Sequence, residues 1–141
     1  MAKAARWETF PHEADIGVRG YGATRAQAFE QAAVAMTAVI ADPAGIAADE
    51  AVELRCEAPD DELLFVDWLN AVIFEMATRS MLFRRFEVAL EDHRLRGRAF
   101  GERIDVRRHQ PAVEVKGATY TCLRVAQDAD GGWLAQCVVD V

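Results

Sequence analysis

The residues best suited to chemistry lie near the two ends of the sequence. His12, Glu13 and Asp15 form the densest polar cluster of the N-terminal region, directly after Pro11. An imidazole beside carboxylates could serve a metal-dependent hydrolase, but no activated nucleophile accompanies these residues. Asp140 follows an apolar stretch at the other end and adds one more carboxylate. Taken alone, a cluster such as that at residues 12–15 is more often a solvated turn than a site, and Asp140 is unremarkable.

A second polar region runs from residue 101 to residue 109 and ends in Arg107, Arg108 and His109. Its length and mixed charge are typical of a surface loop. Lys116 follows in a more apolar stretch. The sequence has neither a phosphate-binding G-x-x-x-x-G-K-[ST] loop nor a G-x-S-x-G nucleophile elbow. No enzyme motif is therefore present in this region or elsewhere in the chain.

Glycines and cysteines have simpler explanations. The spacing of Gly17, Gly20 and Gly22 differs from the dinucleotide fingerprint and predicts a bulge or a tight turn. Three cysteines, Cys56, Cys122 and Cys137, have neither zinc-site nor C-x-x-C spacing. All three fall in predicted strands, so we expect them to pack as small apolar side chains.

Length and charge bound the class of protein. The 141 residues suit one domain spanning residues 1–141, and the net charge of −7 disfavours binding nucleic acid without a partner. Residues 79–124 hold eleven basic and six acidic residues, a local excess of +5. This block could dock on an acidic protein, contact RNA held by a partner, or simply line the solvent face of strands.

No membrane segment is predicted. The longest uncharged apolar run, residues 31–41, is far shorter than the ~20 residues that a spanning helix needs. The first seven residues also lack the apolar stretch of a signal peptide. We therefore expect a cytoplasmic protein.

Hydrophobic periodicity and turn residues predict the elements of secondary structure. Thr24 and Gln27 form a capping box at the start of a helix that Asp42-Pro43 ends. Asp130-Gly131 predicts a hairpin turn. We expect strands at residues 7–11, 15–21, 52–56, 86–90, 95–103, 113–125 and 133–139, and helices at residues 24–40 and 63–79.

The second helix is apolar around nearly its whole circumference, with Asp67, Asn70 and Glu75 on one narrow strip. It is either central to the core or offers its spare face to a partner. The order of elements predicts an α+β fold with two helices packed on one face of a largely antiparallel or mixed sheet.

Taken in order, several segments strongly resemble the archease family, over essentially the whole chain. The segments that carry the resemblance are H-E-A-D-I-G-V-R at 12–19, A-M-T-A-V at 35–39, L-L-F-V-D-W-L-N at 63–70, G-E-R-I-D-V-R-R-H at 101–109, V-K-G-A-T-Y at 115–120 and W-L-A-Q-C-V-V-D-V at 133–141.

The resemblance implies a non-catalytic accessory protein of an RtcB-type RNA ligase, which joins 3′-phosphate and 5′-hydroxyl ends in tRNA splicing and RNA repair. Such a protein promotes guanylylation of the ligase and restores its multiple turnover. It would meet RNA only through the ligase. A general chaperone or modulator of tRNA-modifying enzymes is the alternative function.

The resemblance also implies a divalent metal site, with Ca²⁺ as the ion, at Asp15, Asp140 and Val141. Oxygen donors of this kind suit a hard cation, and Val141 would contribute its α-carboxylate as the last residue of the sequence. Candidate contacts to the partner are His12, Lys116, Arg107, Arg108 and His109. The chain departs from the family pattern at three positions, Glu13, Gly117 and Thr121.

Overall fold

The computed structural model describes residues 4–141 and begins with a hairpin followed by a helix. Strands β1 (Arg6–His12) and β2 (Asp15–Gly22) pair antiparallel, and helix α1 (Arg25–Ile40) follows at once. The predicted capping box is confirmed, because the Thr24 hydroxyl accepts from the Gln27 N–H. The Gln27 side chain reaches back to the N–H of Ala23 at 2.8 Å. A short 3-10 turn, η1 (Pro43–Gly45), comes after the helix, and Asp42 caps it.

The middle of the chain forms a second sheet and the second helix. Strand β3 (Glu50–Glu57) precedes helix α2 (Asp61–Arg79), which is followed by strands β4 (Met81–Glu91) and β5 (Arg94–Arg103). The Asp60 carboxylate caps α2 by accepting from the Leu63 N–H at 2.8 Å. Ser80 ends the helix in the left-handed conformation, with φ of 53°, so that β4 starts directly afterwards.

The C-terminal part holds one helical turn, α3 (Val106–His109), and three strands. They are β6 (Gly117–Ala118), β7 (Arg124–Gln127) and β8 (Trp133–Asp140). The predicted hairpin turn at Asp130-Gly131 is confirmed between β7 and β8, where Gly131 has a φ of 85°.

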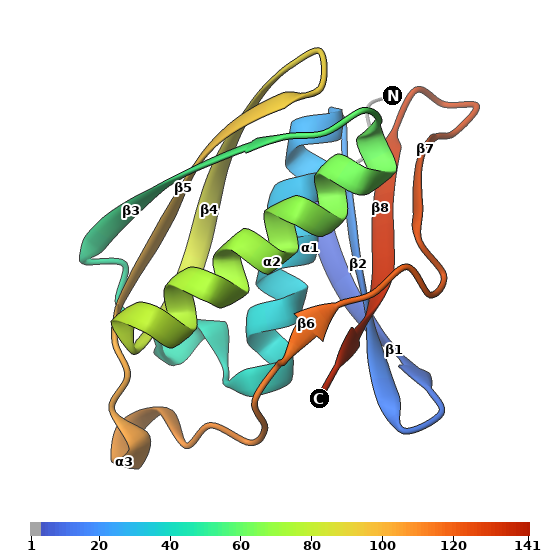
Figure 1. Ribbon diagram of the computed structural model, residues 1–141. Coiled ribbons are helices and arrows are strands. Elements are labelled where there is room, and N and C mark those ends of the chain that lie inside the picture. The colour runs from blue at the N-terminus through green and yellow to red at the C-terminus, as the bar shows by residue number, and fades with distance from the viewer. Residues whose placement is uncertain (1–3) are drawn as a thin grey trace.

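The strands divide into two antiparallel sheets. One sheet has the order β1-β2-β8-β6, with β7 also pairing with β8, and the other has the order β3-β5-β4. Figure 1 shows α1 and α2 on the same side of both sheets, with β3 as the outermost strand of the smaller one. The α+β class and the two-helix layer are confirmed, and every strand pair is antiparallel.

The core forms where the two helices meet both sheets. Phe29 of α1 and Phe65 of α2 lie edge to face with centroids 5.1 Å apart, and Trp68 packs edge to face on Phe86 of β4. The Trp68 indole N–H donates to the Phe29 carbonyl at 3.1 Å, so this buried polar group is satisfied. Helix α2 is therefore central to the core, although Phe74 remains 62% exposed.

The strand predicted at residues 113–125 is not continuous. Within this segment only two short strands, β6 and β7, pair with β8, and Cys122 between them has a φ of 55°. The Thr119 hydroxyl donates to the Val138 carbonyl at 2.7 Å and stabilises the break. Cys122 is consequently exposed, contrary to the prediction, whereas Cys137 is buried and Cys56 half-buried.

Within residues 4–141, no helix is long and apolar enough to cross a membrane.

Gly20 lets β2 and α1 approach more closely than any side chain would permit. A Cβ atom at this position would lie 2.1 Å from the Ala28 carbonyl oxygen and 2.3 Å from the Ala32 nitrogen. These are backbone atoms of α1, which cannot move without shifting the whole helix. Gly20 therefore sets the distance between helix and sheet.

We expect Gly20→Ala to lower the free energy of unfolding by about 1–3 kcal/mol or more, because overpacking against backbone cannot relax. Gly45→Ala is the matched control, since a Cβ there meets nothing within 4 Å. Urea denaturation of both variants measures the difference. Equal stability of the two variants would contradict this account of Gly20.

Candidate functional site

The polar cluster near the N-terminus forms the tip of the β1–β2 hairpin. His12 and Asp15 are the last paired residues, and Glu13 and Ala14 make the two-residue turn. Glu13 is exposed and has a φ of 54°, a conformation that favours Gly or Asn over other residues. His12 and Asp15 are both half-buried. The turn thus projects one carboxylate into solvent and places another beside the neighbouring strand.

Pairing of β2 with β8 brings the tip of the β1–β2 hairpin beside the last residues of β8. Ile16 lies opposite Val139, so the same register places Asp15 opposite Asp140. Side chains of directly opposed residues project from the same face of a sheet. The Asp15 Oδ1 atom also accepts a hydrogen bond from the Val141 N–H at 3.3 Å. The three residues implied by the family resemblance are therefore neighbours.

A row of side chains across three strands fixes this register. Glu8 of β1, Arg19 of β2 and Gln136 of β8 lie directly opposite one another. The Arg19 guanidinium donates to Glu8 at 2.6 Å and to Gln136 at 2.7 Å. The Tyr21 hydroxyl donates to the same Glu8 oxygen at 2.8 Å. Hydrogen bonds from Arg19 and Tyr21 lower the pKa of Glu8, which keeps it ionised.

A third segment, around β6, joins the site from the other side of β8. The Lys116 N–H donates to the Asp140 carbonyl at 2.8 Å, and Gly117 pairs with Asp140. Asn70 of α2 accepts from the Ala118 N–H at 2.9 Å and anchors this segment. Sequence reasoning did not find that role for Asn70, although a carboxamide on a nearly apolar helix was the available signal.

The donors at this site fit a hard divalent cation in kind, though not in number. Asp15 and Asp140 supply carboxylate oxygens and Val141 a main-chain oxygen, the ligand types that Ca²⁺ prefers. Within residues 4–141, no group of three His, Cys, Asp or Glu side chains converges. Ca²⁺ takes six to eight oxygens. Asp15, Asp140 and Val141 would therefore hold only part of its coordination shell.

The second polar region folds into a closed network around Glu102. Glu102 pairs with Arg108 and accepts from the Ala47 N–H at 2.5 Å. Its Oε2 atom also lies 3.1 Å from the Nε2 atom of His109. The Arg108 guanidinium donates further to the Gly45 carbonyl at 3.1 Å. This network ties β5 and α3 to the segment after α1.

His109 is buried in this network, contrary to the surface loop predicted from sequence. Its Nδ1 atom accepts from the Asp105 N–H at 2.9 Å, so Nε2 carries the proton and donates to Glu102. Both ring nitrogens are thus used within the chain. Of the predicted contact residues, Arg108 and His109 hold the loop, while Arg107 and Lys116 are exposed.

Two of the three cysteine thiols, those of Cys56 and Cys137, are unsuited to nucleophilic chemistry because they are buried or half-buried. Burial raises the pKa of Cys56 to about 11 and that of Cys137 to about 12, so both stay protonated near neutral pH. The site therefore offers oxygen ligands from Asp15, Asp140 and Val141, with the exposed cation Lys116 beside them.

Comparison with known proteins identifies the family of this chain. A model of the archease protein family matches residues 7–141. The chain belongs to the archease family. It is 36% identical over 140 residues to the archease of Pyrococcus abyssi, covering 96% of this chain and 99% of that protein. An archease of Methanosarcina barkeri is also 36% identical, with 99% of both chains covered.

Solved structures of archease relatives share the fold. The solution structure of protein 1598 of Methanobacterium thermoautotrophicum has a TM-score of 0.83 and 32% identity, and covers 96% of this chain and 98% of that one. A Thermotoga maritima crystal structure, described as an archease and possible chaperone, has a TM-score of 0.62 and 20% identity. It covers 95% of this chain and 96% of that one, and the resemblance at this identity concerns the fold alone.

The Glu102 network predicts a specific pH dependence of stability. Hydrogen bonds from Arg108, Ala47 and His109 lower the pKa of Glu102 from 4.5 to about 2. The stability it contributes is therefore complete above about pH 4.5 and is lost as the pH falls toward 2. Glu102→Gln should flatten the fall in unfolding free energy over this interval, measured by urea denaturation at stepped pH. Glu50→Gln, at an exposed strand start, is the control, and equal flattening in both variants would refute the assignment.

Proposed function

We propose that this archease is a non-catalytic accessory protein of an RtcB-type RNA ligase, which it activates by promoting guanylylation of the ligase. Membership of the family over residues 7–141 is the observation that carries the proposal. The chemistry of the site supports it, because Asp15 and Val141 are in contact and, together with Asp140, provide oxygen ligands and negative charge. RNA would be met only through the ligase.

The convergence of Asp15, Asp140 and Val141 supports a cation site at the hairpin tip. Two carboxylates on directly opposed strand positions repel each other unless a cation lies between them. A bound Ca²⁺ supplies that compensation and would order the β1–β2 turn against the end of β8. Glu13 is exposed in the same turn, so its carboxylate could act as a further ligand to the cation when a partner is bound.

The proposed contacts to the ligase are Lys116 beside this site, Arg107 on α3 and His12 at the hairpin tip. Lys116 adjoins Asp140 through its backbone, and its side chain is exposed. Arg107 is exposed on α3, and His12 is half-buried at the hairpin tip. Arg108 and His109 contribute indirectly, by fixing the loop that carries Arg107.

A second candidate function is that of a chaperone or modulator of tRNA-modifying enzymes. The description of the Thermotoga maritima relative as a possible chaperone favours it. The two functions differ in stoichiometry. An activator restores ligase turnover at sub-stoichiometric amounts, whereas a holding chaperone is needed in proportion to its client. Ligase turnover with GTP and Mn²⁺ at graded amounts of the protein distinguishes them.

Asp15→Asn and Asp140→Asn should each weaken Ca²⁺ binding by about tenfold or more. The Ca²⁺ affinity of such sites follows the number of charged ligands. Even mutation of a residue that only hydrogen-bonds to a metal ligand lowers metal affinity by about 10- to 100-fold. Calorimetric titration measures the affinity. Asp130→Asn, in the exposed β7–β8 turn, is the control, and unchanged affinity in both site variants would exclude the proposed metal site.

Lys116→Ala should reduce stimulation of ligase guanylylation while leaving Ca²⁺ affinity unchanged, because its ammonium is exposed and its backbone hydrogen bond survives the substitution. Arg124→Ala removes a different exposed cation, on β7, as the control. If both variants stimulate the ligase like the unmodified protein, Lys116 makes no contact of consequence.

A further inference from the structure

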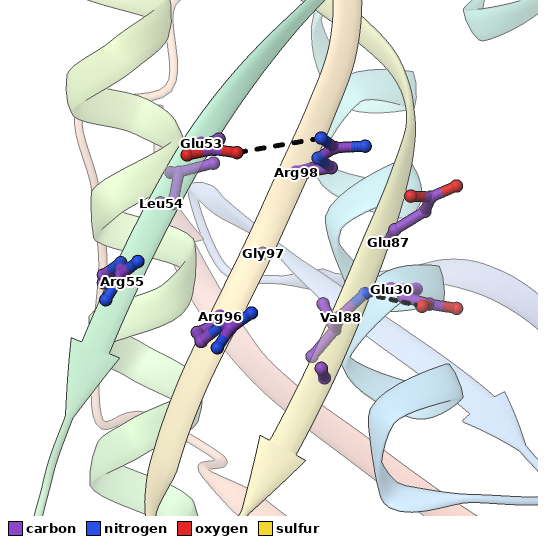
Figure 2. Close-up of a pocket in the computed structure, with 10 residues that line it drawn as sticks. Glu30, Glu53, Leu54, Arg55, Glu87, Val88, Arg96, Gly97 and Arg98 are labelled. Carbon is purple, nitrogen blue, oxygen red and sulfur yellow. Dashed lines mark hydrogen bonds and ion pairs between the residues drawn. The ribbon is translucent and has the colours of Figure 1, made fainter.

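The outer face of the smaller sheet carries four rows of side chains that cross β3, β5 and β4. Because side chains alternate between faces, residues paired in register form rows pointing away from the helices. Figure 2 shows this face, with the helices behind the strands. From one end, the rows are Ala51–Phe100–Arg85, Glu53–Arg98–Glu87, Arg55–Arg96–Ala89 and Glu57–Arg94–Glu91.

Three of the five arginines on this face have acidic partners. Arg98 pairs with Glu53 at 3.7 Å, and Arg94 pairs with Glu57 at 3.8 Å. Arg85 pairs with Glu87 at 3.1 Å and also lies over the ring of Phe100. Each of these guanidinium groups therefore has its charge compensated inside the chain.

Arg55 and Arg96 are the exception. They lie directly opposite each other on β3 and β5, both are exposed, and neither has an acidic partner within residues 4–141. Figure 2 shows an ion pair between Glu53 and Arg98 but no contact from Arg55 or Arg96. Like charges directly opposite one another destabilise a sheet. The pair therefore costs stability that an Arg–Glu pair at the same positions would not.

The third strand leaves space beside this pair. Ala89 occupies the row on β4, so no side chain beyond Cβ covers the two guanidinium groups. Arg55, Arg96 and Ala89 line one part of a shallow hollow of about 270 Å³, and Glu30, Glu53, Glu87 and Arg98 line other parts of it. Arg55 and Arg96 therefore both border one hollow that a small ligand can enter.

We propose that Arg55 and Arg96 form a binding site for a single terminal phosphate group. Two guanidinium forks present more donors than one carboxylate can accept, whereas a phosphate has three terminal oxygens and up to two negative charges. The site stands on this arrangement alone and does not depend on the proposed function.

The flanking rows make the site selective for a terminal phosphate over an extended nucleic-acid backbone. Each neighbouring row holds one arginine between two glutamates and has a net charge of −1. Rows on one face are about 7 Å apart, because two residues separate them along each strand. A chain of phosphodiesters crossing the rows would lie over the glutamates of both flanking rows, whereas one phosphate centred on Arg55 and Arg96 lies on the row that holds no glutamate.

Nitrogen-15 NMR of the arginine Nε–H groups, with inorganic phosphate titrated at constant ionic strength, tests the proposal. We expect saturable shifts at Arg55 and Arg96. Arg55→Gln and Arg96→Gln should each weaken binding about tenfold, and the double variant should abolish it. Arg94→Gln, on the same strand and face as Arg96 but ion-paired, should leave the affinity unchanged. Shifts that do not saturate, or equal loss with Arg94→Gln, would overturn the proposal.

A nucleoside monophosphate and a short oligonucleotide without terminal phosphates separate the sources of the ligand. The monophosphate should bind like inorganic phosphate, and the oligonucleotide should bind more weakly than either. Tighter binding of the oligonucleotide would overturn the selectivity argued from the flanking glutamates.

Arg55→Glu distinguishes a ligand site from a structural role. It places a carboxylate opposite Arg96, so it should raise the thermal unfolding midpoint while abolishing phosphate binding. Sedimentation at the NMR concentration supplies the remaining outcome. One outcome would be a dimer that Arg55→Gln dissociates and that phosphate does not affect. The partner of Arg55 would then be a second copy of the chain joined along β3, and the proposed phosphate site would be wrong.

Discussion

The register between β2 and β8 is the constraint on which the rest of this protein depends. Strand side chains alternate with a period of two, so a slip of one residue would exchange the two faces of β8. Cys137 of β8, which is fully buried, would then turn to solvent, and Asp15 would no longer face Asp140. The row formed by Glu8, Arg19 and Gln136 opposes such a slip, because each hydrogen bond in it requires this one pairing.

Helix α1 joins the two sheets, which do not pair with each other. It packs against β2 through Gly20 and approaches β4, an edge strand of the smaller sheet, on its other side. The Glu30 carboxylate accepts from the Val88 N–H at 2.7 Å, and the Thr37 hydroxyl donates to the Phe83 carbonyl at 2.8 Å. Burial raises the pKa of Glu30. These bonds satisfy backbone groups that an edge strand would otherwise leave exposed to another chain.

Arginine has two contrasting uses in this chain. Arg19 and Arg108 each bond an acidic residue and a second acceptor, so their donors fix strand register and loop position. Within residues 4–141, Arg55 and Arg96 contribute no such bond, although they lie opposite each other on the same sheet face as paired arginines. The contrast is informative because the neighbouring rows show that the same face can compensate an arginine fully. A local departure from a rule that its surroundings obey is the kind of feature that marks a site.

The sequence alone determined most of the elements, because their causes are local. The capping pair Thr24 and Gln27 was sufficient for the start of α1, and alternation was sufficient for β3 and β5. Family motifs in the sequence also named Asp15, Asp140 and Val141, but their neighbourhood depends on pairing between residues more than 120 positions apart. The break near Cys122, the burial of His109 and the unpaired state of Arg55 were likewise decided only in three dimensions. Each depends on which partner a side chain meets across the fold, and short-range periodicity carries no information about that partner.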